Sequence, residues 1–201
     1  MRFSLRHASL LLFAVAALGG CMTPSVHPIA TADREVSDER IVGAWLQEDG
    51  KITYTVTKAD EGYRLHVGKK AEKPGEKPVD AALDMRLVQL GAHRFIDVSA
   101  PGAERHGMGE KHGTFFIPTH MFARVEVVPD GVTVWWMKAA FLRQAMTDKS
   151  IAATPLDDKE HGPVLITAET EKLQAFLRTH AENDEAWEKV TLTRVKSDPA
   201  R

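Results

Sequence analysis

Short segments of alternating apolar and polar residues, separated by turn sequences, follow one another along the chain from residue 41 onward. Residues 52–57 alternate and are rich in β-branched side chains, and residues 63–67 alternate again after the turn at 60–62. Successive side chains of a strand point to opposite faces, so this pattern predicts strands with one buried face. Many short strands joined by hairpins favour an antiparallel barrel or a sandwich.

The spacing of the apolar residues becomes helical twice in the later part of the chain. Between residues 139 and 148, Phe141 and Ala145 fall on one face, and further along Leu173 and Leu177 do the same. We therefore predict a mainly β fold, an antiparallel barrel of about eight or nine strands with two late α-helices. One domain over residues 39–196, with a tail at 197–201, is large enough to bury a core of its own.

Charge and cysteine content exclude several classes of function. The 26 basic and 28 acidic residues give a formal net charge of −2, so we expect no nucleic acid as a partner. Cys21 is the only cysteine, which excludes an intramolecular disulfide, zinc-cysteine sites and a cysteine nucleophile in the folded body. No G-x-S-x-G nucleophile motif occurs, which argues against a serine hydrolase. No phosphate-binding glycine loop occurs either, and we expect no cofactor.

The first residues have the composition of an export signal. Arg2 and Arg6 precede an uninterrupted apolar stretch at 8–18, which is too short to span a bilayer comfortably. The sequence Leu18-Gly19-Gly20-Cys21 then resembles the lipobox of bacterial lipoproteins. That resemblance implies that Cys21 is acylated and becomes the N-terminus, and that the membrane is a partner through this lipid anchor. The alternative is an ordinary signal peptide with a chance cysteine at this position.

The residues after the lipobox bear on where the protein is located and on how Cys21 is joined to the folded body. The resemblance to lipoproteins implies the outer membrane of the cell envelope, because Met22 stands where an Asp retains some lipoproteins at the inner membrane. Residues 22–38 contain two prolines and sustain no period. We therefore predict a flexible tether that lies outside the fold.

A second resemblance concerns the barrel itself. The sequence Gly43-Ala44-Trp45 in the first predicted strand resembles the Gly-x-Trp opening of lipocalins, which are small-ligand barrels. In that family a late arginine stacks over the tryptophan and closes one end of the barrel, and Arg194 is the matching residue. The resemblance implies a lipocalin-like barrel, although the helical stretch at 139–148 and the missing disulfide depart from it. The alternative is that Trp45 is a core aromatic of another barrel or sandwich. The body also resembles bacterial proteins of uncharacterised activity, which implies no function.

Aromatic residues are the candidates for lining a ligand cavity. Trp135 and Trp136 are adjacent in a predicted strand, so one should point inward and the other should meet a helix or a partner. The full set of candidate lining residues is Phe115, Phe116, Phe122, Trp135 and Trp136. An apolar barrel mouth would bind a small hydrophobic ligand, whereas filling of the core by side chains predicts the same residues.

Three histidines near one another raise the possibility of a metal site. His106, His112 and His120 occur in a segment that also carries Glu104 and Glu110. Imidazole and carboxylate groups bind zinc, nickel and copper, but this spacing matches no helical ligand motif. The simpler interpretation is a polar, glycine-rich loop.

Three hypotheses therefore remain open. The preferred one is a non-enzymatic, membrane-anchored lipoprotein that binds a small apolar or amphipathic molecule. The second is a lipoprotein with a filled core that acts through its surface on an unknown protein partner, and it predicts an exposed apolar patch. The third is a metal-binding protein that uses the region from His106 to His120.

Overall fold

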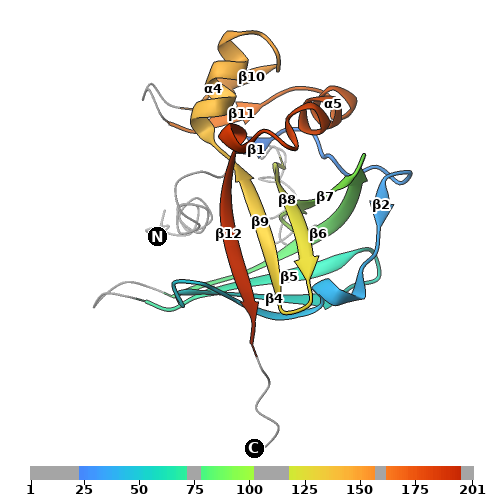
Figure 1. Cartoon of the computed structure of the whole chain (residues 1–201), viewed down its shortest axis with the longest axis vertical. Helices are drawn as coiled ribbons and strands as arrows, with labels where there is room; N and C mark the ends of the chain where they lie inside the picture. The colour runs from blue at the N-terminus through green and yellow to red at the C-terminus, as the bar shows by residue number, and fades with distance from the viewer. Residues whose placement is uncertain (1–22, 72–77, 102–117, 157–161, 196–201) are drawn as a thin grey trace, which may run out of the picture.

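Eight antiparallel strands close into a barrel in the computed structural model, which describes residues 23–71, 78–101, 118–156 and 162–195 (Figure 1). Around the ring, β3 to β9 pair in chain order, and β12 pairs with both β9 and β3. The barrel strands are β3 (Gly43–Gln47), β4 (Ile52–Lys58), β5 (Tyr63–Lys69), β6 (Val79–Leu90), β7 (His93–Ser99), β8 (His120–Val128), β9 (Gly131–Met137) and β12 (Trp187–Arg194). The predicted mainly β fold, an antiparallel barrel with two late α-helices, is confirmed.

The two-residue alternation of the strands separates an inner core from an outer one. On β9, Val134 and Trp136 belong to the core inside the barrel, whereas Trp135 and Met137 pack in a second core outside it. Successive side chains of a strand point to opposite faces, so two apolar neighbours must serve two different cores. The strand therefore reads as a continuous apolar run because both of its faces are buried.

Between β9 and β12 the chain leaves the barrel and forms a cover for its outer face. This cover consists of α4 (Ala139–Thr147), β10 (Ala153–Pro155), β11 (Val164–Ile166), α5 (Thr170–His180) and η2 (Asp184–Ala186), which lie together at one end of the molecule (Figure 1). Leu142 of α4 and Leu177 of α5 are fully buried against outward side chains such as Phe95 and Phe122. Burying each such side chain contributes about 1.5–3 kcal/mol to stability, which holds the cover on the barrel.

The segment before the barrel is part of the fold, which contradicts the predicted flexible tether. β1 (Pro24–Ser25) pairs with β8 on one side and with β11 on the other, and β2 (Glu35–Val36) pairs with β6. η1 (Glu39–Ile41) then leads into β3, and Ile29 is 1% exposed in the outer core. Pairings of two residues leave no period in the sequence, so the alternation pattern could not indicate them.

A buried carboxylate on β7 holds this N-terminal segment against the barrel. Asp97 is 3% exposed, and its Oδ2 accepts hydrogen bonds from the backbone amides of Ile29 at 2.7 Å and Ala30 at 2.9 Å. Its Oδ1 lies 2.7 Å from Nδ1 of His120 on β8. Gln174 of α5 completes the attachment by donating to the carbonyl oxygen of Ile29 at 2.9 Å. A buried carboxylate requires such partners, because desolvation of an unpaired charge is costly.

Replacing Asp97 by alanine should release the N-terminal segment. We expect the free energy of unfolding to fall by about 3 kcal/mol in urea titrations, because one buried and one partly buried amide lose their carboxylate acceptor. Limited proteolysis should then cut the variant near residues 29–30. Asp84→Ala is the matched control, since Asp84 is half-exposed and pairs with Arg64 at 2.9 Å, an interaction worth at most about 1 kcal/mol. Equal losses in the two variants would contradict the role given to Asp97.

Candidate functional site

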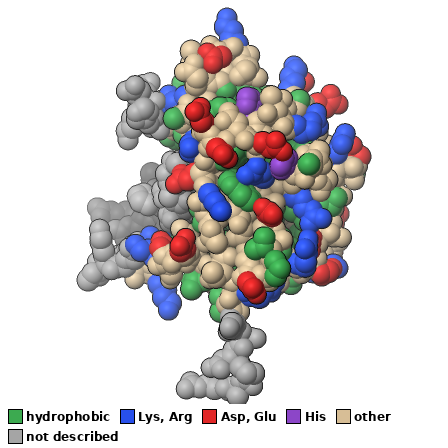
Figure 2. Space-filling view, in the orientation of Figure 1, with side chains coloured by type: hydrophobic (Ala, Val, Ile, Leu, Met, Phe, Trp, Pro, Cys, Tyr) green, Lys and Arg blue, Asp and Glu red, His purple; other side chains and the backbone are tan. Residues whose placement is uncertain are grey.

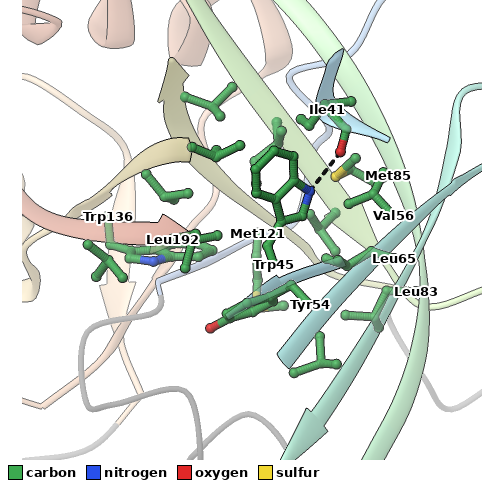
Figure 3. A pocket seen from close by; sticks show the side chains of 17 residues that line it. Ile41, Trp45, Tyr54, Val56, Leu65, Leu83, Met85, Met121, Trp136 and Leu192 are labelled. Atoms are coloured by element: carbon green, nitrogen blue, oxygen red, sulfur yellow. Dashed lines mark hydrogen bonds between the residues drawn. The ribbon is translucent and has the colours of Figure 1, made fainter. Parts of the chain in front are cut away.

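A cavity of about 60 Å³ lies inside the barrel and is lined by seventeen side chains (Figure 3). They come from η1 and from all eight barrel strands, and almost all of them are aliphatic or aromatic. The indole Nε1 of Trp45 is already used, since it donates to the carbonyl oxygen of Ile41 at 2.8 Å. An apolar lining with few polar groups is typical of sites that take up hydrophobic parts of small molecules.

One end of the cavity is closed by a stacked arginine. The guanidinium carbon of Arg194 lies 4.1 Å from the ring centroid of Trp45, which is 1% exposed. Arg194 also donates from Nη1 to the carbonyl oxygen of Val42 at 3.1 Å and from Nη2 to that of Arg40 at 2.8 Å. The stacking contributes about 0.5–2 kcal/mol. Arg194 therefore ties the end of β12 to the chain entering β3 and covers the tryptophan.

The glycine in this closure leaves room for the arginine. Gly43 has φ +141°, a backbone conformation that L residues rarely adopt. A Cβ at this position would lie 2.5 Å from Nη1 of Arg194. The Gly-x-Trp sequence thus serves two purposes, because glycine makes space for the guanidinium and tryptophan supplies the ring beneath it.

The other end of the cavity is the open end. The lining side chains that are half-buried rather than buried are Tyr54, Leu83, Met121, Trp136 and Val190. Met121 follows the first residue of β8 and Trp136 precedes the last residue of β9. Since Trp136 is level with Glu188, near the start of β12, and with Ala123, near the start of β8, Met121 and Trp136 lie at the end opposite Arg194. This end, at Met121 and Trp136, is therefore the less buried end of the cavity.

Tyr54 is a lining residue whose phenol is close to a polar group. Burial, together with the negative charge of Asp49, raises the pKa of Tyr54 to about 12. Its hydroxyl lies 3.4 Å from Oε1 of Gln47, at the limit of a hydrogen bond. Tyr54 therefore remains neutral at physiological pH and offers the cavity one weakly engaged hydroxyl, which is where the polar part of a ligand would find a partner.

The structure places the predicted lining residues on both sides of the barrel wall. Trp136 lines the cavity and Trp135 packs in the outer core, so one tryptophan of the pair lies on each side of the wall. Phe122 also packs in the outer core, so its assignment to the cavity was wrong. The strand alternation explains this result, because Met121 is the inward neighbour of Phe122. Phe115 and Phe116 lie outside the described residues. Aromatic character alone misdirected the prediction, and the alternation of β8 is the signal that would have found Met121.

The outward tryptophan meets the cover, as expected from the helix that follows it. The guanidinium of Arg124 lies 4.1 Å from the ring centroid of Trp135 and 5.9 Å from that of Trp187. Arg124 also donates to the carbonyl oxygen of Ala181, and burial lowers its pKa. Arg124 thus joins the barrel wall to the cover and leaves neither ring free for a ligand.

Of the three histidines predicted as metal ligands, the structure describes His120. His120 is hydrogen-bonded to Asp97, whereas His106 and His112 lie outside the described residues. Among the residues that the structure describes, no group of three or more histidine, cysteine or carboxylate side chains is arranged to hold a metal ion. His120 is accounted for by its role in the attachment of the N-terminal segment.

On the face shown in Figure 2, acidic and basic side chains are interspersed and form no large patch of one charge. Within the described ranges, no helix has the length and apolar character needed to cross a membrane.

Comparison of the chain with family models, curated proteins and solved structures finds no match. The cavity and its two unlike ends are therefore the main structural basis for a function.

Replacing Gly43 by alanine should destabilise the barrel more than the same change at Gly50. Both glycines have a positive φ, but nothing lies within 4 Å of a Cβ at Gly50, so Gly50→Ala should cost only about 1 kcal/mol. Gly43→Ala should cost about 2–4 kcal/mol, because the backbone penalty is joined by a clash with Arg194. Thermal and urea unfolding would measure both changes.

A double-mutant cycle tests the contact itself. Arg194→Ala in the Gly43→Ala background should cost less than Arg194→Ala alone, since the clash disappears with the guanidinium. Strictly additive costs would show that the two residues are not coupled.

Proposed function

We propose that this protein is a lipid-anchored protein of the cell envelope that binds the apolar part of a small amphipathic molecule inside its barrel. The supporting observation is the cavity, which has an apolar lining, one end closed by Arg194 and Trp45, and one end edged by half-buried side chains. A barrel with this construction removes an apolar group from water and leaves a polar head at the open end.

The size of the cavity limits which part of a ligand enters. At about 60 Å³ it is smaller than the roughly 150 Å³ engineered cavity that holds benzene in another protein. The proposed occupant is therefore narrow, such as the end of a single acyl chain, rather than a fused ring system. Deeper entry requires lining side chains to move, and Met85 and Met121 are suited to this because methionine is unbranched and adaptable.

The small volume also favours a second candidate, a lipoprotein with a filled core that acts through its surface. That candidate requires an exposed apolar patch. Among the described residues, the large hydrophobic side chains that are exposed are Val128 at 40%, Leu156 at 52% and Val195 at 43%. Isolated apolar side chains are common on protein surfaces, so these do not by themselves indicate a partner. The cavity is the more specific feature, and we give it preference.

A matched pair of substitutions on β5 tests ligand binding. Val67 lines the cavity, whereas its neighbour His66 is exposed on the outer face. Val67→Phe should weaken binding of a brominated fatty acid at least about tenfold, because the ring occupies the space of the ligand and overpacking costs about 1–3 kcal/mol. His66→Phe should leave binding unchanged.

Quenching of tryptophan fluorescence provides the measurement. Trp45 and Trp136 line the cavity, so bromine atoms bound there should quench them. Unfolding free energies of both variants serve as the control for folding. Absence of quenching in the unmodified protein would reject the proposed binding of a small amphipathic molecule, the carrier function, and would favour the filled-core candidate.

The anchor rests on the lipobox-like sequence and has its own test. Cys21→Ser should move the protein from the membrane fraction to the soluble fraction, because stable anchoring requires more than one acyl chain on the processed cysteine. The intact mass of the unmodified protein should include the acyl groups and lack the preceding residues. A soluble, unacylated protein with Cys21 in place would contradict the anchor.

A further inference from the structure

The N-terminal segment enters the fold beside the open end of the cavity. Pro24 of β1 pairs with Met121 of β8, and Ser25 pairs with His120. Met121 is one of the half-buried side chains at that open end. β1 occupies the edge of β8 that β9 leaves free, because the last residues paired between β8 and β9 at this end are Ala123 and Trp136.

This attachment is firm rather than a loose contact. Ser25 is fully buried, and Val26 donates its amide to the carbonyl oxygen of Ile166 at 2.9 Å. Asp97 then holds the amides of Ile29 and Ala30, as described above. The position of Pro24 relative to the barrel is therefore fixed by backbone pairing on both sides of β1 and by a buried carboxylate.

The chain between the anchor and this fixed point is very short. Only Met22 and Thr23 separate Cys21 from Pro24. Three residue steps span at most about 11 Å, since an extended chain advances by no more than about 3.6 Å per residue. An acylated Cys21 lies at the surface of the bilayer because its acyl chains are buried in the lipid. The start of β1, and with it the open end of the barrel, is then held close to that surface.

We infer that the open end of the barrel faces the membrane to which the protein is anchored, so that the cavity exchanges its ligand directly with the lipid leaflet. The inference rests on the proposed lipid anchor and names the ligand class: a molecule of that leaflet with one apolar chain and a polar head. Arg194 and the turn between β8 and β9 face away from the membrane. The head remains at the bilayer surface while the chain enters between Met121 and Trp136.

Single labels at the two ends of the barrel test this orientation. Because acylation uses the thiol of the only cysteine, one introduced cysteine can be labelled selectively in the full, acylated protein. Thr119 is exposed beside the start of β8 at the open end, and Asp130 is exposed in the β8–β9 turn at the closed end. The nine residues of β8 separate the two sites by roughly 30 Å along the strand.

The measurement is paramagnetic relaxation of a nitroxide by nickel-chelating lipid headgroups, in vesicles of phosphatidylethanolamine and phosphatidylglycerol. The label in Thr119→Cys should relax several-fold more strongly than the label in Asp130→Cys. Inserting a Gly/Ser linker of about ten residues after Met22 should remove most of this difference, because the restraint becomes a flexible coil. Equal relaxation at the two sites, or stronger relaxation at Asp130→Cys, would overturn the inference.

The same preparation separates this inference from the proposed function. Orientation is measured without a ligand, whereas quenching by the brominated fatty acid reports on the cavity. Strong relaxation at Thr119→Cys without quenching would retain the orientation and reject the carrier function. Quenching with equal relaxation at both labels would retain the carrier function and reject the orientation.

Discussion

The pairing of β12 with both β9 and β3 is the interaction on which the rest of the structure depends. It turns a row of antiparallel strands into a closed ring, so no barrel strand is left with an unpaired edge. Closure also brings Arg194 over Trp45 and so gives the interior one sealed end. An open sheet would have neither an interior nor two different ends, and the proposed binding site exists only because the ring is complete.

A large part of the wall of this ring is buried on both faces. The inner face surrounds the cavity, while the outer face of β6 to β9 and β12 carries the cover and the N-terminal segment. This doubly buried wall includes β8, on whose edge β1 pairs beside Met121. The outer core therefore stabilises the barrel and also fixes the place at which the N-terminal segment joins it.

The fold could be predicted from the sequence largely because barrel strands have a period of two. Alternation located the strands, helical spacing located α4 and α5, and the Gly-x-Trp sequence pointed to the arrangement of Gly43, Trp45 and Arg194. The cavity was harder to predict, because a strand that is apolar on both faces does not show which face is inside. Phe122 was assigned to the wrong core for this reason. The ordered N-terminal segment was missed because its contacts, such as those to Asp97, join residues far apart in the sequence.

The long segment between β9 and β12 affects the order in which the barrel strands can pair during folding. Thr193 pairs with Leu46 across a separation of 147 residues, so one edge of β3 is paired early by β4 while the other edge is paired only by the last strand of the chain. Contacts between such distant residues form slowly, since loop closure precedes any gain from pairing. A chain interrupted before β12 would present the bare edges of β3 and β9, which are templates for aggregation. The stage of folding at which seven strands are paired and β12 is not is therefore the stage most exposed to aggregation.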